Sequence, residues 1–171
     1  RVLFRSFIQY GKTHAGELNW ASGGTASTQG LAGLMFSSMA GIKTVQIQYK
    51  GSSQGLADLL GGSIQFMFNP MPSIIQHAKS GKLKILGVAS TERLALHPEI
   101  QVIGELVPGF HASGWFGLVA PAGTPKEVVE RLNREIGEIV RSTETRNAMI
   151  ESGLEPRVMS PADFARLMTT D

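Results

Sequence analysis

Three apolar stretches, each followed by a small polar turn and a helix pattern, constrain the fold of this chain most strongly. The stretches lie at residues 18–22, 45–49 and 64–68, and the turns after them contain Gly, Ser, Asn or Pro. Strands that alternate with helices predict a parallel sheet. The turns after parallel strands meet at one edge, where α/β proteins bind small ligands. The sequence therefore predicts an α/β fold with a small-molecule site at the carboxyl ends of its strands.

The rest of the chain continues the alternation of helices and strands. Apolar spacing predicts helices at residues 28–39, 53–60, 71–80 and 143–151, a long helix from Pro125, and a last helix from Ser160-Pro161. Further strands are predicted at residues 83–90, 111–120 and 155–159. The long helix has an apolar face that we expect to be buried, made of Val128, Val129, Leu132, Ile136, Ile139 and Val140.

Composition limits the classes of function. The chain has 171 residues, of which 42% are hydrophobic and 18% charged, as in an ordinary globular protein. Its 16 basic residues are spread along the sequence and the net charge is only +2, so a nucleic-acid partner is not expected. No stretch reaches the ~20 apolar residues needed to cross a bilayer, so direct membrane insertion is not expected.

The residue types present predict neither a metal nor a cofactor. Cysteine is absent, which excludes a thiolate nucleophile, a disulfide framework and a sulfur-ligated metal. The four histidines lie far apart in the sequence, without the spacing that places two metal ligands on one helix face.

A set of short motifs runs in order through the chain. The motifs are Gly16-Glu-Leu-Asn19, Tyr49-Lys-Gly-Ser52, Leu59-Leu-Gly-Gly62, Gly81-Lys-Leu83, Val88-Ala-Ser90, Val107-Pro-Gly-Phe110, Trp115-Phe-Gly117, Ala120-Pro-Ala-Gly-Thr-Pro125 and Ser152-Gly-Leu-Glu-Pro156. As an ordered set they resemble the receptors of tripartite tricarboxylate transporters, the Bug-type extracytoplasmic solute receptors. The resemblance extends over about residues 7–171.

The resemblance implies a fold and a function. Members have the type II periplasmic binding protein fold, with two α/β lobes around a cleft, and they capture small carboxylates for a membrane permease; they are not enzymes. Residues 7–114 would form the second, ligand-binding lobe, nearly complete. Residues 115–171 would be the return segment that completes part of the first lobe, truncated at the C-terminus. The resemblance also implies a periplasmic location, although this chain begins without a signal peptide.

The first six residues are predicted to be a non-native leader. The run Arg1-Val-Leu-Phe-Arg-Ser6 looks like a translated sequencing adapter, and the resemblance to the family fades at this point. The alternative is a native helix start, because Leu3, Phe4, Phe7 and Ile8 can share one helix face.

The turn after the first predicted strand can hold a carboxylate without a full positive charge. Gly23 and Gly24 let the backbone approach a ligand, and the N–H groups of residues 25–28 open a helix whose dipole favours an anion. Ser22, Ser27 and Thr28 add hydroxyl donors. Thr25-Ala26 stands where relatives often carry Asn-Gly, which would alter the ligand that fits. The alternative is a plain tight turn with a capped helix.

The turns after the second and third predicted strands complete the expected site. Gly51 and Ser52 are favoured over Lys50, because a lysine at a strand end is usually a solvated surface charge. Asn69, where many relatives carry an aspartate, can donate as well as accept, which favours an acidic or neutral ligand tail over an ammonium group; it could also be an ordinary turn residue before Pro70. The predicted ligand-binding residues are Ser22, Gly23, Gly24, Thr25, Ala26, Ser27, Thr28, Gly51, Ser52 and Asn69.

Two hypotheses from other classes compete with the receptor. The run Gly51-Ser52-Ser53-Gln54-Gly55 matches the nucleophile elbow of a small α/β serine hydrolase, with Ser53 as the nucleophile. Its acid and base would come from Asp58 or Glu92 and from His97 or His111. The effector-binding part of a transcription regulator can share the receptor fold, but no helix-turn-helix segment or basic patch favours it.

The receptor hypothesis explains the largest number of residues. In it, two lobes close on a small di- or tricarboxylate because ligand contacts to both lobes stabilise the closed state, and the closed receptor docks to the permease. Since half of such a cleft would lie outside this sequence, the chain alone is expected to bind weakly or not at all. The identity of the carboxylate, the oligomeric state and independent folding are not fixed by the sequence.

Overall fold

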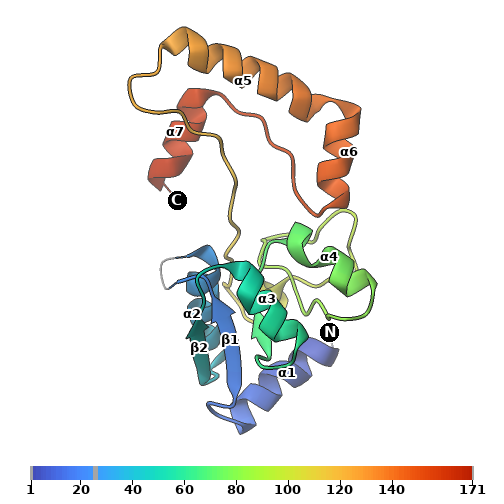
Figure 1. Ribbon diagram of the computed structural model, residues 1–171. Coiled ribbons are helices and arrows are strands. Elements are labelled where there is room, and N and C mark those ends of the chain that lie inside the picture. Colours follow the sequence, from blue (N-terminus) through green and yellow to red (C-terminus); the bar gives the residue numbers. More distant parts are fainter. Residues whose placement is uncertain (1, 25–26, 171) are drawn as a thin grey trace. The chain divides into compact units, whose positions relative to one another are not determined.

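The computed structural model describes residues 2–24 and 27–170, and the chain forms two compact units, Arg1–Gly114 and Trp115–Asp171 (Figure 1). The helices of the first unit are α1 (Val2–Thr13), α2 (Thr28–Ala40), α3 (Ser52–Leu60), α4 (Met71–Lys79) and the short 3-10 helix η1 (Ile103–Glu105). Its strands are β1 (Leu18–Ser22), β2 (Thr44–Gln48) and β3 (Phe66–Met67). The second unit contains α5 (Lys126–Arg141), α6 (Thr143–Glu151) and α7 (Pro161–Thr170).

The sheet of the first unit is parallel, with β1 between β2 and β3. In the register of the strands, Ser22 lies opposite Gln48 and Ala21 lies opposite Met67. The three strands therefore end side by side, and α2, α3 and α4 begin in the turns that follow them. This arrangement confirms the predicted parallel α/β pattern in this part of the chain.

Helices cover both faces of this sheet. Successive side chains of a strand point to opposite faces, so Trp20 and Ala21 mark the two sides of β1. A Cβ atom on Gly33 of α2 would overlap the Trp20 ring, and a Cβ atom on Gly55 of α3 would lie 2.6 Å from Ala21 Cβ. Glycine thus allows both helices to lie directly on β1, with α2 on one face and α3 on the other.

Phenylalanine side chains form the centre of the core. Phe36 of α2 is 2% exposed, and five other rings lie with their centroids within 6.4 Å of it: Phe4, Phe7, Phe66, Phe68 and Phe110. Phe4 is itself only 3% exposed, so α1 packs into this core, whereas Leu3 is 59% exposed. The alternative prediction, a helix that starts at residues 3–8, is therefore confirmed as a helix. Of the face expected for it, Phe4, Phe7 and Ile8 contact the core, but Leu3 does not.

The strand predicted at residues 83–90 is wrong. A single bridge joins Val88 to Val102, in which the Val88 N–H donates to Gln101 O at 2.9 Å and the Ile103 N–H donates to Val88 O at 2.9 Å. The neighbouring segment cannot extend this pairing, because it turns into η1 at Ile103. The apolar run correctly indicated burial at Val88 but not the short length of its partner.

The strands predicted at residues 111–120 and 155–159 are also wrong. Both segments lack regular pairing, and Phe116, Leu118 and Val119 are 80%, 69% and 70% exposed. A strand needs a neighbour to receive its N–H and C=O groups. Residues 115–170 contain no strand that could provide one.

The second unit is a small helical assembly around α5. The Asn133 side chain of α5 donates to Met159 O at 3.0 Å, and a Cβ atom on Gly137 would lie 3.1 Å from Val158. The Phe164 ring packs edge-on against Trp115, with ring centroids 5.1 Å apart. The predicted burial of the α5 apolar face is wrong for three of its residues, because Val128, Leu132 and Ile139 are 45%, 43% and 58% exposed. These side chains have no sheet to cover in residues 115–170.

Candidate binding edge at the carboxyl ends of the strands

The ends of β1 and β2 are joined by a backbone hydrogen bond at the predicted site. The Tyr49 N–H, directly after β2, donates to the carbonyl oxygen of Ser22 at 2.9 Å. The turns that open α2 and α3 therefore start next to each other. This geometry brings the predicted residues of the first turn close to Gly51 and Ser52 of the second.

Ser22 is at the centre of a hydrogen-bond network inside the protein. Its hydroxyl oxygen accepts from Gln46 Nε2 at 2.8 Å and from the Gly24 N–H at 3.2 Å, and the hydroxyl donates to Gly24 O at 3.1 Å. Ser22 is only 2% exposed. These contacts fully use the hydroxyl, so Ser22 fixes the shape of the turn.

Ser27 has a similar internal role as the N-cap of α2. Its hydroxyl oxygen accepts from the Gly30 N–H at 3.0 Å, and the hydroxyl donates to Gly24 O at 2.7 Å. Gly24 has φ +117°, a conformation that side chains rarely adopt, so glycine is required there. Gly23 beside it is exposed, whereas Thr25 and Ala26 lie outside the described residues.

Backbone N–H groups at this edge remain available to a ligand. Among the described residues, nothing accepts a hydrogen bond from the N–H groups of Thr28 and Gln29 in the first turn of α2. In the same way α3 begins after Gly51, which provides no side-chain cap, and its first residues Ser52 and Ser53 are exposed. Open helix N-termini attract anions through these donors and through the helix dipole.

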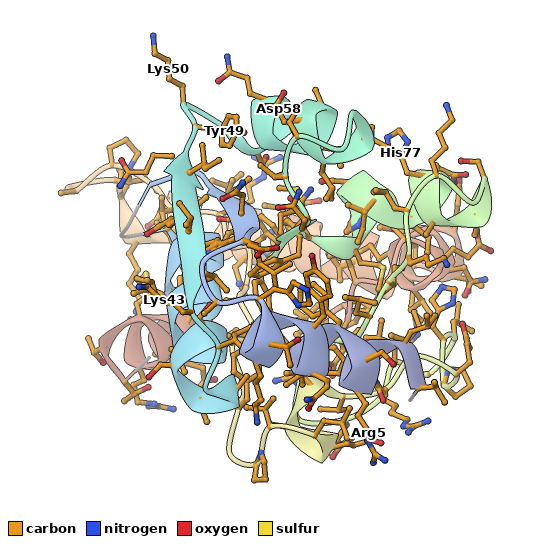
Figure 2. All side chains as sticks on the ribbon, turned by 90° about the horizontal axis from the view of Figure 1, so that it is seen from below. Arg5, Lys43, Tyr49, Lys50, Asp58 and His77 are labelled. Atoms are coloured by element: carbon orange, nitrogen blue, oxygen red, sulfur yellow. The ribbon has the colours of Figure 1, made fainter. Side chains whose placement is uncertain are left out.

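Tyr49 and Asp58 form a polar pair beside the second turn. The Tyr49 hydroxyl donates to Asp58 Oδ2 at 2.7 Å. This hydrogen bond, with smaller effects of desolvation and of the Asp58 charge, raises the pKa of the Tyr49 phenol above its ordinary value. Figure 2 shows the two side chains next to each other at α3, while Lys50 points away into solvent. Sequence reasoning missed Tyr49, and also Gln46, because no local pattern indicates contacts between a strand and a distant turn or helix.

Asn69 lies in the third turn, between β3 and α4. Its side-chain Oδ1 and Nδ2 atoms are both buried and have no hydrogen-bond partner among the described residues. Leaving a buried polar group unpaired costs about 1–3 kcal/mol, so such groups usually have a structural or functional explanation. Among the described residues of the predicted site, Asn69 is therefore the one with buried side-chain polar atoms that have no partner.

The described residues contain no catalytic triad of the kind that the hydrolase hypothesis requires. Ser53 is exposed in the first turn of α3 and makes no hydrogen bond to a described histidine. Asp58 is bound by Tyr49, and His97 Nδ1 lies 3.2 Å from Glu99 Oε1. A nucleophile needs a base within hydrogen-bond reach, and that base needs a partner that orients it.

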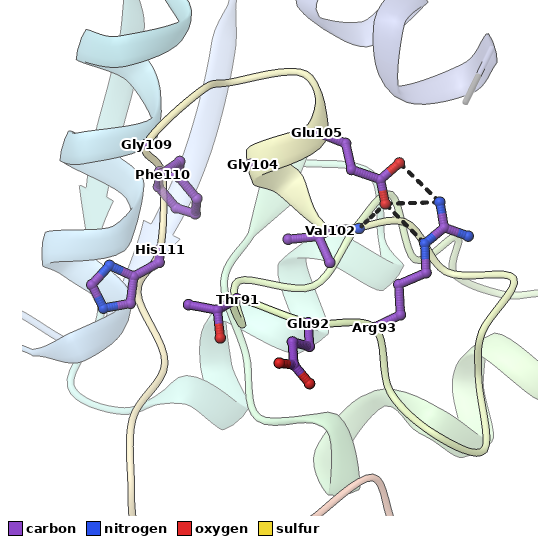
Figure 3. A pocket seen from close by; sticks show the side chains of 9 residues that line it. All are labelled: Thr91, Glu92, Arg93, Val102, Gly104, Glu105, Gly109, Phe110 and His111. Carbon is purple, nitrogen blue, oxygen red and sulfur yellow. Dashed lines mark hydrogen bonds and ion pairs between the residues drawn. The ribbon is translucent and has the colours of Figure 1, made fainter.

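A shallow hollow of about 640 Å³ lies elsewhere on the first unit (Figure 3). At its rim the Arg93 guanidinium pairs with both carboxylate oxygens of Glu105 at 2.8 Å. None of the ten predicted site residues lines this hollow. Among the described residues, no three His, Asp or Glu side chains gather at a possible metal site, and no helix is long and apolar enough to span a bilayer.

The sequence model of the family described as "Tripartite tricarboxylate transporter family receptor" matches residues 3–171. The chain belongs to this family. Among its relatives, Protein BugT of Bordetella pertussis is 33% identical over 151 residues, an alignment that covers 88% of this chain and 46% of the relative. The chain thus spans about half the length of the curated relatives it matches.

Solved structures of receptors share this fold. "R. palustris Rpa4515 with adipate" is 29% identical with a TM-score of 0.93, covering 96% of this chain and 56% of the other. "MatC (Rpa3494) from Rhodopseudomonas palustris with bound malate" is 26% identical with a TM-score of 0.86, covering 96% and 57%. The periplasmic binding protein BugD is 29% identical with a TM-score of 0.80, covering 87% and 50%.

These matches confirm the receptor family and the α/β fold of the periplasmic binding protein type. Each match covers about half of the solved chain. The family consists of receptors and not enzymes, so the hydrolase alternative is not supported.

Proposed function

We propose that this chain is part of a receptor that captures a small organic di- or tricarboxylate and delivers it to a membrane permease. The family and the relatives solved with adipate and malate support a carboxylate ligand. In this proposal residues 7–114 provide the ligand-binding lobe, and residues 115–171 are the return segment of the other lobe. In this proposal the receptor acts in the periplasm, which is supported by two solved relatives that are described as periplasmic.

The observation that carries the proposal is the pair of open helix N-termini at adjacent strand ends. The N–H groups of Thr28 and Gln29, which have no acceptor among the described residues, lie in one turn, and the uncapped start of α3 at Gly51 and Ser52 lies in the next. Together they offer several donors to a carboxylate, and hydrogen bonds to charged groups are stronger than those to neutral groups. The anion is thus held by N–H groups and helix dipoles without a lysine or arginine.

The remaining predicted residues have supporting roles in this site. Ser22, Ser27 and Gly24 hold the first turn in shape through their mutual hydrogen bonds, and Gly23 leaves the approach to the turn open. Asn69, whose buried amide has no partner among the described residues, would direct it toward the far end of the ligand. Thr25 and Ala26, which lie outside the described residues, remain predicted contacts of the carboxylate.

Closure of two lobes links binding to transport. Contacts of the ligand to both lobes stabilise the closed state relative to the open one, and a permease can select the closed receptor by its shape. Since a single lobe provides only part of the contacts, the isolated chain should bind dicarboxylates weakly. Such weak binding is best measured by an NMR titration, which reports on each residue separately.

Substitution of Thr28 by proline tests the site directly. Thr28 is the first residue of α2, where proline is well tolerated, and the extended backbone of Ser27 is suitable for a residue before proline. Thr28→Pro therefore deletes one N–H group at the start of α2 without breaking the helix. In an NMR titration of the labelled chain with adipate or malate, we expect shifts at Gln29 and Ser52 in the wild type, and roughly tenfold weaker binding in the variant.

Thr28→Val is the matched control, because it removes the hydroxyl but keeps the N–H group. It should lose much less affinity than Thr28→Pro. A diamine of similar length, cadaverine, should cause no shifts at these residues. The proposal is contradicted if the dicarboxylates shift no residue at this edge of the sheet, or if Thr28→Pro binds them as well as the wild type does.

A further inference from the structure

Tyr49 connects three elements at the second turn of the binding edge. Its N–H donates to Ser22 O at 2.9 Å at the end of β1, and its hydroxyl donates to Asp58 Oδ2 at 2.7 Å on α3. Its ring lies beside Gly55, where an added Cβ atom would be 3.5 Å from Tyr49 Cδ2. Tyr49 thus links the chain just after β2 to β1 through its backbone N–H group and to α3 through its side chain.

The contact between α3 and the sheet needs such a link. Gly55 is buried directly over Ala21, and neither residue has a side chain long enough to interlock with the other. Hydrogen bonds are directional, whereas contact between small apolar groups is not. The bond from Tyr49 to Asp58 is therefore suited to stop α3 from sliding or turning on β1.

Asp58 is otherwise poorly placed on its helix. It is the only charged residue of α3 and lies near the C-terminal end, where the helix dipole disfavours a negative charge. The hydroxyl of Tyr49 stabilises the carboxylate at this position. The position of Asp58 is thus better explained by its hydrogen bond to Tyr49, the residue after β2, than by any benefit to the helix.

We propose that the Tyr49–Asp58 hydrogen bond is a latch that fixes the first turn of α3, residues Gly51 to Ser53, at the binding edge. Tyr49 is then a positioning residue: it does not touch the ligand but sets the place where the N–H groups of the turn meet a carboxylate. The effect on ligand affinity rests on the proposed function, whereas the effect on the turn rests on the contacts alone.

Tyr49→Phe tests the latch, because it removes only the hydroxyl and leaves the N–H group and the ring in place. We expect lower NMR order parameters for Gly51, Ser52 and Ser53, and roughly threefold to tenfold weaker binding of adipate, the range of one ordinary hydrogen bond. The chain offers a matched control in Tyr10→Phe, since its other tyrosine lies on α1 with its hydroxyl near Glu17. That control should change neither quantity.

Asp58→Ala should reproduce both effects of Tyr49→Phe, and combining the two changes should add little, because each removes the same bond. Asp58→Asn keeps an acceptor and should restore part of the order and the affinity. Unchanged order parameters in Tyr49→Phe would overturn the inference, and so would lower order with unchanged affinity. If the wild type does not bind adipate, the proposed function is wrong. The NMR order parameters of Gly51, Ser52 and Ser53 then decide alone whether the latch exists.

Discussion

The two units of this protein both contain amphipathic helices, such as α1 in the first and α5 in the second, but they bury their apolar residues very differently. In Arg1–Gly114 the parallel sheet and its helices enclose a continuous core, in which Trp20 and Phe36 are 1% and 2% exposed. Among the described residues of Trp115–Asp171, by contrast, Gly137 is the only buried one. An amphipathic pattern predicts that a helix forms, but burial also requires a second element with a matching apolar face.

The helix α5 shows how the second unit forms without a core of its own. Its polar side carries ion pairs at helical spacing, with Lys126 Nζ 3.4 Å from Glu130 Oε1 and Arg131 Nε 3.8 Å from Glu135 Oε1. Such exposed pairs contribute only about 0.3–0.5 kcal/mol each. They support the helix locally, whereas α2 depends on its contacts with the sheet.

Truncation of one large side chain in each unit should show the largest contrast. Phe36→Ala removes the centre of the aromatic core and should lower the free energy of unfolding of the first unit by about 3–5 kcal/mol. Leu132→Ala removes a 43% exposed side chain from α5 and should change stability by less than about 0.5 kcal/mol. Urea unfolding of each variant and of the wild type, followed by the NMR amide signals of each unit, measures both values.

The contrast would disappear if Leu132→Ala cost about 2 kcal/mol or more, the range of a buried leucine. In that case the apolar face of α5 packs against another part of the protein in solution. Ile139→Ala, at a position that is 58% exposed, is an independent check on the same face. It should be as mild as Leu132→Ala.

Adding a methyl group to one glycine of each unit should have opposite effects. Gly33→Ala forces a Cβ atom into the Trp20 ring and should destabilise the first unit by about 1–3 kcal/mol. In α5, a Cβ atom on Gly137 meets Val158 and the flexible end of Arg141 at 3.1 and 3.2 Å. There the better helix propensity of alanine should yield no net loss and up to about 1 kcal/mol of gain. Equal losses in the same urea experiment would show that α5 is packed as tightly as α2.

Sequence reasoning succeeded where the signal was local. The helices that were predicted have their starts and ends correct to within about two residues, because caps and periodicity are properties of neighbouring residues. The helix α1 was not predicted, since a helix start at residues 3–8 was only the alternative to a non-native leader. The predicted helix at residues 143–151 coincides with α6, for example. The wrong strands at residues 83–90, 111–120 and 155–159 share a different cause. A strand depends on a partner that is distant in sequence, and an apolar run does not reveal whether that partner exists.

The candidate site divides in the same way. The positions of the three turns follow from strand ends and turn residues, so Gly23, Gly51 and Asn69 could be selected from the sequence. The internal use of the Ser22 hydroxyl could not, because its partner Gln46 lies 24 residues away. The same holds for the bond between Tyr49 and Asp58. Predicting contacts of this kind requires the register of the strands and the position of the helix on the sheet.

Removal of a helix cap should have a moderate effect in both units. Ser27→Ala deletes the acceptor of the Gly30 N–H, 3.0 Å away, and should cost about 1 kcal/mol. Ser142→Ala at the start of α6 deletes a longer bond, 3.3 Å from the Thr145 N–H, and should cost about 0.5 kcal/mol. Ser38→Ala, in the interior of α2, is a suitable control because it removes no cap. A larger loss from Ser142→Ala than from Ser27→Ala would reverse the expected order of the two units.

The smallest expected difference is the pH at which each unit loses a local hydrogen bond. The hydrogen bond to Asp58 raises the pKa of Tyr49, so the stability from this bond is complete below about pH 10 and is lost as pH rises through the raised pKa. In α7, the hydrogen bond from Ser160 and then the charge of Arg166 lower the pKa of Asp163. That contribution is present above about pH 4 and is lost as pH falls through the lowered pKa.

NMR titration of the tyrosine ring carbons and the aspartate carboxyl carbons measures both groups, with Tyr49→Phe and Asp163→Asn to assign the signals. Since both side chains are in contact with solvent, the shifts should be small, but their directions are opposite: the first unit loses its bond in alkali and the second in acid. Ordinary titration of Tyr49 would argue against the bond to Asp58 in solution, and thus against the latch, while leaving the packing contrast between the units intact.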